Sequence, residues 1–135
     1  MYTINLTMSN YNETREKYST LQKHQRDLIK IMALIDSPQT RTKIIQVCVK
    51  SKIKDKSNQS YTAVALAHEL DTLKSIWLVK KNLDQKYQIY PKAFDFVLRQ
   101  AVEDSQLKIM RKSVEEALPG INSHTNYNRT AEALY

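Results

Sequence analysis

The sequence predicts a mainly α-helical fold with one small β-hairpin. Apolar residues recur at spacings of three and four along most of the 135 residues, which is the period of an amphipathic helix. Residues 76–81 and 86–90 have the pattern of two short strands, and the polar tetrapeptide between them suits a hairpin turn. The chain has a single glycine, Gly120, although glycine normally forms the sharp turns of α/β proteins. The length fits one modest core with extra helices at either end.

The N-terminal segment combines two different patterns. Residues 2–8 alternate apolar and polar side chains without a break, which predicts a half-buried strand. Asn10 and Glu13 then have the spacing of a capping box, so we expect a helix to begin there. An apolar stripe leads from Tyr11 to Ile35 and predicts one helix, or two with a break. The stripe favours a core position, although pairing of its N-terminal part with another subunit stays open.

A proline and two threonines mark the start of the next helix. Pro38 ends the preceding helix, because the residue before a proline is pushed out of the α region. Thr40 or Thr42 can cap the second helix, although the β-branched residues that follow leave a strand open. The lone cysteine, Cys48, lies in this apolar run. We expect it to be a buried hydrophobic residue in a reducing compartment.

A third helix is predicted at residues 61–75. It follows a lysine-rich connection at 50–60 whose last residue, Ser60, suits a helix cap. One face of the helix is apolar and is expected to meet the core: Ala63, Leu66, Ala67, Leu70 and Leu73. The opposite face is expected to be exposed: Thr62, Ala65, His68, Glu69 and Thr72. Trp77, between this helix and the hairpin, has a large apolar area and is expected to anchor the core.

The last helical segment changes phase half-way. Pro91 fits the first position of a helix, whose apolar face then carries Phe94, Val97, Leu98 and Ala101. After Asp104 the stripe moves to Leu107, Met110, Val114 and Ala117, so we expect this half to pack on a different surface, a partner subunit included. We divide the chain into an N-terminal strand and helix extension (1–20), a central domain (21–101), a C-terminal helix (102–118) and a linker with the start of a further helix (119–135). The chain's abrupt end leaves open that it is one end of a longer protein.

The positive charge is concentrated in the middle of the chain. The whole sequence has 21 basic and 14 acidic residues, for a net charge of +7. Residues 41–92 contain eleven basic and four acidic residues, so this segment alone carries +7, and the rest of the chain, with ten of each, carries none. Such a concentration attracts polyanions, nucleic acid above all. A solvated lysine-rich surface that serves only solubility is the alternative.

Several function classes receive no support. A chain with one glycine cannot contain a P-loop or a dinucleotide-binding fingerprint. We find no Ser-His-Asp or Cys-His arrangement, and we expect no enzyme activity and no cofactor. The three histidines, His24, His68 and His124, have no metal-ligand spacing, so we expect no metal. There is neither a signal peptide nor an apolar run of roughly 18 residues, so we expect a cytoplasmic protein that does not enter membranes.

The central segment resembles the winged-helix family of DNA-binding domains. The order of its elements is helix, helix, helix, hairpin, helix, and three short motifs add to the likeness: LDTL at 70–73, LVKK at 78–81 and YQIYP at 87–91. The resemblance covers roughly residues 26–100 and is strongest to bacterial repressor-like proteins of the MarR and PadR type. Trp77 stands where this family commonly has glycine, so we expect the end of the third helix to be shaped differently.

The resemblance implies a transcriptional regulator that binds double-stranded DNA. The third helix would lie in the major groove with Thr62, Ala65, His68 and Thr72 nearest the bases. Basic residues would contact phosphates: Arg41 and Lys43 beside the second helix, Lys80, Lys81 and Lys86 on the hairpin, and Lys50, Lys52, Lys54 and Lys56 in the connection. A homodimer would form through the terminal helices, at Tyr18, Leu21, Leu107, Met110 and Val114.

Two other functions stay open for the same fold. The acidic residues Glu69 and Asp71 around the third helix, together with the abrupt C-terminal end, are compatible with a protein-interaction module at the end of a larger multidomain protein. A plasmid or phage replication or partition protein is the other alternative.

Overall fold

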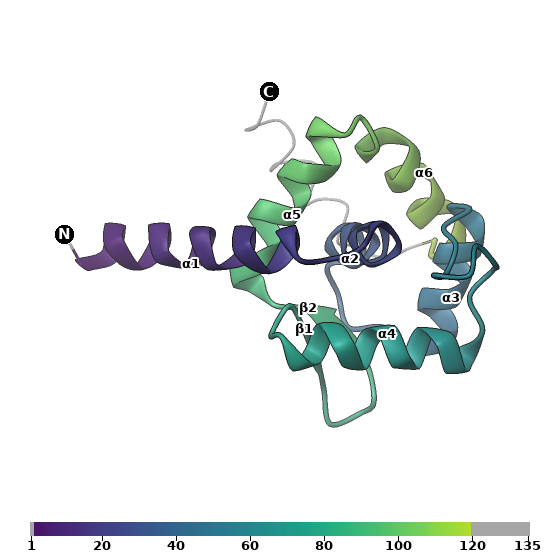
Figure 1. The fold of residues 1–135 in the computed structure, drawn as a ribbon. Coiled ribbons are helices and arrows are strands. Elements are labelled where there is room, and N and C mark those ends of the chain that lie inside the picture. Colours follow the sequence, from purple (N-terminus) through teal and green to yellow (C-terminus); the bar gives the residue numbers. More distant parts are fainter. Residues whose placement is uncertain (1, 120–135) are drawn as a thin grey trace.

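The computed structural model describes residues 2–119, and the side chains from Tyr11 onward. This part of the chain contains six α-helices and one two-stranded antiparallel sheet (Figure 1). In chain order these are α1 (Tyr2–Ser19), α2 (Lys23–Ile35), α3 (Arg41–Lys50), α4 (Ala63–Ser75), β1 (Val79–Lys81), β2 (Tyr87–Ile89), α5 (Pro91–Glu103) and α6 (Leu107–Ala117). The prediction of a mainly helical fold with a small hairpin is therefore confirmed.

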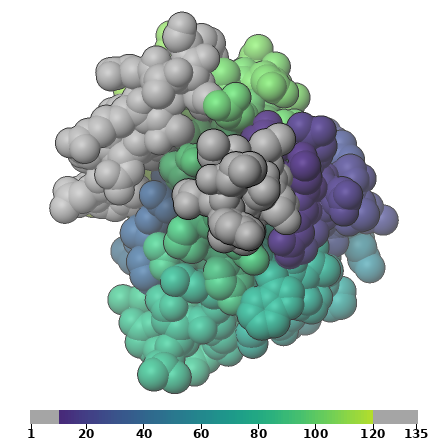
Figure 2. Space-filling view, turned by 90° about the vertical axis from the view of Figure 1, so that its left-hand side faces the viewer, coloured from purple at the N-terminus to yellow at the C-terminus, as the bar shows by residue number. Residues whose placement is uncertain are grey.

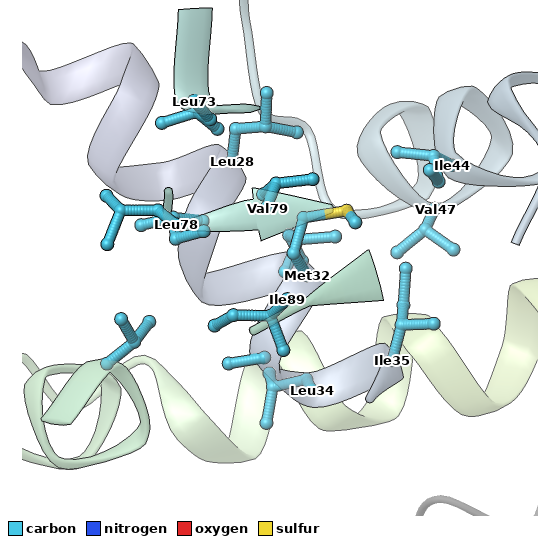
Figure 3. Close-up of a cluster of buried hydrophobic side chains, with 14 of the residues drawn as sticks. Leu28, Met32, Leu34, Ile35, Ile44, Val47, Leu73, Leu78, Val79 and Ile89 are labelled. Carbon is cyan, nitrogen blue, oxygen red and sulfur yellow. The ribbon is translucent and has the colours of Figure 1, made fainter. Parts of the chain in front are cut away.

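Helix α2 is the centre of the fold. Every residue from Asp27 to Ile35 is buried, and the helix contacts α3, α5, α6 and β2. Figure 3 shows its side chains Leu28, Met32 and Ile35 packed among those of α3, α4 and the hairpin. Burying each side chain of this size contributes roughly 1.5–3 kcal/mol, so this cluster supplies much of the folding free energy. The fold thus surrounds α2 with the other elements (Figure 1).

The expected N-terminal strand at residues 2–8 is wrong. Helix α1 begins at Tyr2 and continues through Asn10, which therefore caps no helix. A strand needs a neighbour for its backbone N–H and C=O groups, whereas a helix satisfies these groups within the segment. Near its C-terminal end α1 buries Thr14 and Tyr18, and it contacts α5. Residues 2–8 are therefore helical despite their alternating pattern, as the first part of a helix whose later residues pack on the core.

Local capping chemistry sets most helix boundaries. The long apolar stripe is divided into two helices at Gln22, which forms a capping box with Gln25. Of the two candidate caps of α3, Thr40 is used, and its hydroxyl accepts a hydrogen bond from the Lys43 amide at 3.3 Å. Ser60 was the wrong choice for α4, because Thr62 is the cap and accepts from the Ala65 amide at 3.1 Å.

The hairpin is attached to the segment that precedes α3. Its strands pair Val79 with Ile89 and Lys81 with Tyr87. Tyr87 also exchanges two backbone hydrogen bonds with Gln39, at 2.8 Å and 3.1 Å. This additional pairing holds the turn end of the β2 strand against the segment that precedes α3.

Helices α3, α4 and α5 end in the same way, with a residue in the left-handed conformation just beyond the helix. The three residues are Lys52 (φ 58), Trp77 (φ 65) and Ser105 (φ 58). In each case this amide and the next one close back on the last turn, as Trp77 N–H does on Lys74 O and Leu78 N–H on Leu73 O, both at 3.0 Å. This is the Schellman motif, which usually has glycine at the left-handed position.

The expected core position of Trp77 is wrong. Its side chain is 60% exposed and lies beside the Tyr90 ring, with the ring centroids 6.1 Å apart. The left-handed backbone turns this residue outward, and the next residue, Leu78, enters the core instead. The backbone at Trp77 therefore has the left-handed conformation that glycine usually adopts at a helix end. The expectation that tryptophan at this position would give the helix end a different shape is wrong.

A buried lysine joins the middle of the fold to its C-terminal part. Lys30 of α2 is buried, and its ammonium group contacts the carboxylate of Asp104 and donates to Gln106 Oε1 at 2.6 Å. Both partners lie in the turn between α5 and α6. The phase shift expected after Asp104 thus coincides with a helix break, and α6 packs on α2 and α3.

Candidate nucleic-acid interface

Three elements with exposed polar side chains lie next to one another. Helix α4 contacts α3 on one side and β1 on the other. In Figure 1, α4 runs along the lower edge of the molecule and the hairpin projects beyond it. The same elements form the lower end of the molecule in the perpendicular view (Figure 2). The structure therefore places the predicted recognition helix beside the predicted wing.

The pairing of Gln39 with Tyr87 brings two sets of cations together. Arg41 and Lys43 are exposed on the first turn of α3, directly after this pairing. Lys81 lies opposite Tyr87 in the strand register, and Lys86 precedes it. The first turn of α3 has no acidic residue, so the positive end of its helix dipole is not compensated there. This corner of the molecule is consequently suited to an anionic partner.

The hairpin lysines are partly occupied by local contacts. Lys81 Nζ lies 5.6 Å from the centre of the Tyr87 ring, within the range of a cation–π interaction. Lys86 Nζ is 3.7 Å from Asp84 Oδ2, both on the turn side of the hairpin. Lys80 is half-buried and faces the opposite side of the strand from Lys81. Lys81, opposite Tyr87, and Lys86, next to it, are the hairpin cations that flank the residue paired with Gln39.

The outward stripe of α4 differs from the one expected. His68 is exposed as predicted, but Ala65 and Thr72 are half-buried. The hydroxyl of Thr62 caps the helix, and that of Thr72 donates to the His68 carbonyl at 3.0 Å. The exposed residues at helical spacing are Val64, His68, Asp71 and Ser75. Val64 and Asp71 were missed, although their spacing of four and three from His68 is the signal that identifies them.

The expectation that Glu69 is exposed is wrong. Its side chain is buried, and Oε2 lies 2.9 Å from Nε2 of His24 on α2. The two atoms are close enough for an ion pair, but their directions are not those of a hydrogen bond. Glu69 is three residues after Leu66 and four before Leu73, both in the core, so the helical period places it on the inner face.

The lysines of the α3–α4 connection belong to a different region. Lys52, Lys54 and Lys56 line a cavity of about 530 Å³ together with residues of α2 and α6. Lys50 at the end of α3 lies 3.7 Å from Glu116 of α6. The structure thus groups these residues with α6, whereas Arg41, Lys43, Lys81 and Lys86 are grouped at the hairpin.

The five residues expected at a dimer interface are buried within the single chain. They are Tyr18, Leu21, Leu107, Met110 and Val114, all of which belong to its hydrophobic core. The phase shift after Asp104 was interpreted as a surface for a second subunit, but α6 uses this face to pack on α2 and α3. These side chains are therefore unavailable to a partner in this structure.

The described part of the chain has neither an exposed thiol nor a cluster of metal-ligating side chains. Cys48 is buried, and burial raises the pKa of its thiol to about 12, so the thiol is protonated at neutral pH. Residues 2–119 contain no cluster of three His, Cys, Asp or Glu side chains that could hold a metal ion. His124 and almost all of the predicted 119–135 linker lie outside the described residues. No described helix is both long and apolar enough to cross a bilayer.

Comparison of the chain with protein-family models, with curated proteins and with solved structures gave no match.

Proposed function

We propose that this protein is a winged-helix transcriptional regulator that binds double-stranded DNA. The single observation that carries the proposal is the Gln39–Tyr87 pairing, which joins the cationic start of α3 to the cationic hairpin beside the exposed face of α4. The order of elements in the central domain, α2, α3, α4, hairpin and α5, is the order of the winged-helix family. Such a regulator acts in the cytoplasm.

The interface would combine phosphate contacts with base contacts. Arg41 and Lys43 at the start of α3 and Lys81 on the hairpin would contact phosphates beside α4, and each contact releases bound counterions. The major groove admits an α-helix, and α4 contacts both α3 and β1, the two elements that carry these cations. Lys54 and Lys56 are assigned elsewhere, because they line the cavity with α2 and α6.

The exposed stripe of α4 gives the expected base preferences. Val64 is 81% exposed near the start of the helix and can contact a thymine methyl group. His68 can donate to or accept from a base edge. Asp71 can accept a hydrogen bond from the amino group of cytosine. A site with thymine and cytosine at neighbouring positions is therefore expected to bind most tightly.

A homodimer of this regulator requires a surface other than the one first expected. Two copies would read half-sites about one helical turn apart. Because the five core residues named above are buried, a dimer in solution would have to use residues exposed in the single chain.

The test is titration of a mixed-sequence duplex, followed by fluorescence anisotropy between about 50 and 200 mM salt. Arg41→Gln with Lys81→Gln should weaken binding and reduce the salt slope by about 2. Lys108→Gln with Lys112→Gln on α6 removes the same charge from exposed positions elsewhere and should leave the slope unchanged. Undetectable binding at about 50 mM salt, or equal losses in both variants, would contradict the proposal.

Exposed apolar residues favour one other function, a protein-interaction module. Leu83 at the tip of the hairpin is fully exposed, and Val64 is exposed on the same side of α4 as the carboxylate of Asp71. A protein partner would bury such residues, whereas phosphates would be repelled by Asp71. The same titration separates the two functions, because a module of this kind binds no duplex at low salt.

A further inference from the structure

The lysine-lined cavity is separate from the proposed DNA interface. Its volume is about 530 Å³, within the range of roughly 300–1,000 Å³ that is typical of small-molecule sites. Three parts of the chain form its walls: the first turn of α2, the α3–α4 connection and the first turn of α6. No residue of the hairpin or of α4 lines it.

The cavity has an excess of positive charge. Four lysines and two aspartates line it, which leaves a formal charge of +2. Both aspartates are engaged: Asp27 is buried and pairs with Lys23 at 2.8 Å, and Asp55 accepts backbone hydrogen bonds within its own turn. Lys52 and Lys56 are exposed and have no carboxylate partner among the described residues. Their charges are therefore available to an anion.

Two helices begin at the cavity and add to its positive potential. Helix α2 starts at Lys23 and α6 starts directly after Gln106, and both of these residues line the cavity. Neither helix has an acidic residue in its first turn. Two helix N-termini, each with a partial positive charge and no acidic residue in its first turn, therefore lie at the cavity.

An apolar wall adjoins the lysines. Ile109 is 68% exposed, and Ile53 and Met110 line the cavity beside it with mostly buried side chains. An exposed isoleucine next to several ammonium groups suits a ligand with an anionic end and an apolar body. An inorganic ion alone would leave this wall uncovered.

We propose that this cavity binds a small phosphorylated organic molecule. The lysines of the α3–α4 connection hold the phosphate, and Ile109 covers the organic part. The phosphate has the charge that two unpaired lysines and two helix ends can balance. The proposal stands independently of DNA binding, because no hairpin or α4 residue contributes to it.

The experiment is calorimetric titration of the full chain with 4-nitrophenyl phosphate, at about 150 mM salt to suppress non-specific attraction. Lys52→Gln with Lys56→Gln should weaken binding about tenfold or more, because two charge-assisted contacts are lost. Lys80→Gln with Lys81→Gln on the hairpin removes the same charge and should change the affinity less than about twofold. Ile109→Ser should weaken 4-nitrophenyl phosphate and leave inorganic phosphate unaffected. Lys52, Lys56, Lys81 and Ile109 are exposed and Lys80 is half-buried, so none of these substitutions removes a core side chain.

The possible results test the phosphate site and the organic part of the ligand separately. No binding of 4-nitrophenyl phosphate up to about 10 mM, or equal losses in the two lysine pairs, would overturn the site. Equal affinity for inorganic phosphate and for 4-nitrophenyl phosphate would overturn the organic part of the ligand. A loss confined to the Lys52 and Lys56 pair, together with the selective effect of Ile109→Ser, would establish both parts.

Discussion

His24 and Glu69 bury their ionisable groups against each other between α2 and α4, with Nε2 2.9 Å from Oε2. The side chains are 10% and 7% exposed, so water screens this contact poorly. The contact joins the central helix of the core to the helix that we propose enters DNA. The position of α4 on the core therefore depends partly on a polar pair, in addition to its apolar face.

Glu69→Ala should destabilise the fold by about 1–3 kcal/mol, because it leaves the buried imidazole without its partner. Replacing both groups, by His24→Leu with Glu69→Leu, should return stability to within about 1 kcal/mol of the original, since buried polar pairs are often replaceable by apolar residues. Urea denaturation measures both changes. Asp71→Ala, at an exposed position on the same helix, is the matched control and should change stability by less than about 0.5 kcal/mol. Equal effects of the Glu69 and Asp71 variants would refute the structural role of the pair.

Because Trp77 has a left-handed backbone, we expect glycine at this position to give a more stable protein than alanine, the reverse of the usual order inside a helix. Trp77→Gly should be more stable than Trp77→Ala by about 1 kcal/mol, because φ is 65°, where the Cβ of alanine is strained and glycine has none. Both variants lose the same indole ring, so their difference isolates the backbone. At Ala67, inside α4, glycine should instead be less stable than alanine by about 1 kcal/mol. Thermal unfolding of the three variants is sufficient, and a Trp77→Ala protein more stable than Trp77→Gly would show that the position is not left-handed.

The raised pKa of Asp36 should make the stability of the fold depend on pH. Burial, and then the nearby charge of Asp95, raise the pKa of this carboxyl from 3.8 to about 6. Because the folded protein binds the proton more tightly than the unfolded chain does, ionisation of Asp36 lowers stability as the pH rises from about 4 to about 6. Asp36→Asn removes this loss and keeps a residue that tolerates the left-handed φ of 46°.

The gain from Asp36→Asn should be absent near about pH 4 and reach about 1 kcal/mol near about pH 7, a value reduced by solvent screening of this partly exposed group. Urea denaturation at several pH values measures it. Asp95→Asn should give a smaller gain in stability with the same dependence on pH. The reason is that the Asp95 charge is the second cause of the raised pKa of Asp36. A gain that is constant across this range would mean that Asp36 titrates normally.

Asp71 predicts one base preference within the proposed DNA site. Aspartate accepts from cytosine, whereas asparagine forms a pair of hydrogen bonds with adenine, so Asp71→Asn should shift one position from cytosine to adenine. The variant also loses a negative charge that faces the phosphates, so its affinity for all sequences should rise. Binding to a panel of duplexes with single base changes measures both effects. An unchanged preference at every position would exclude Asp71 from base contact.

Local chemistry made part of the fold predictable from the sequence. Pro91 at the first position of α5, Thr40 at the cap of α3 and the polar turn of the hairpin each act within a few residues, and the structure has all three. The burial of Leu66, Leu70 and Leu73 follows from the helical period. Such features need no knowledge of distant contacts.

The errors arose where distant contacts decide. Residues 2–8 alternate like a strand, but only the three-dimensional fold shows that no strand pairs with them in the described part of the chain. Trp77 was expected in the core on account of its size, whereas the helix end turns it outward. The grouping of Lys54 and Lys56 with α6 joins residues about fifty positions apart, which no local pattern indicates. Glu69 is different, because its spacing from Leu66 already placed it on the inner face.

The three helix ends that use Lys52, Trp77 and Ser105 in place of glycine also affect the unfolded chain. A backbone without glycine at these positions samples fewer conformations when unfolded, and this offsets part of the strain in the folded state. Ser105 is not part of the hairpin and does not itself line the cavity, although its neighbour Gln106 does. Glycine at this position would relieve the strain of the folded backbone and give the unfolded chain more conformations. Of the three helix ends, the one at Ser105 is therefore the place where thermal stability can be adjusted while every residue of both proposed binding surfaces is kept.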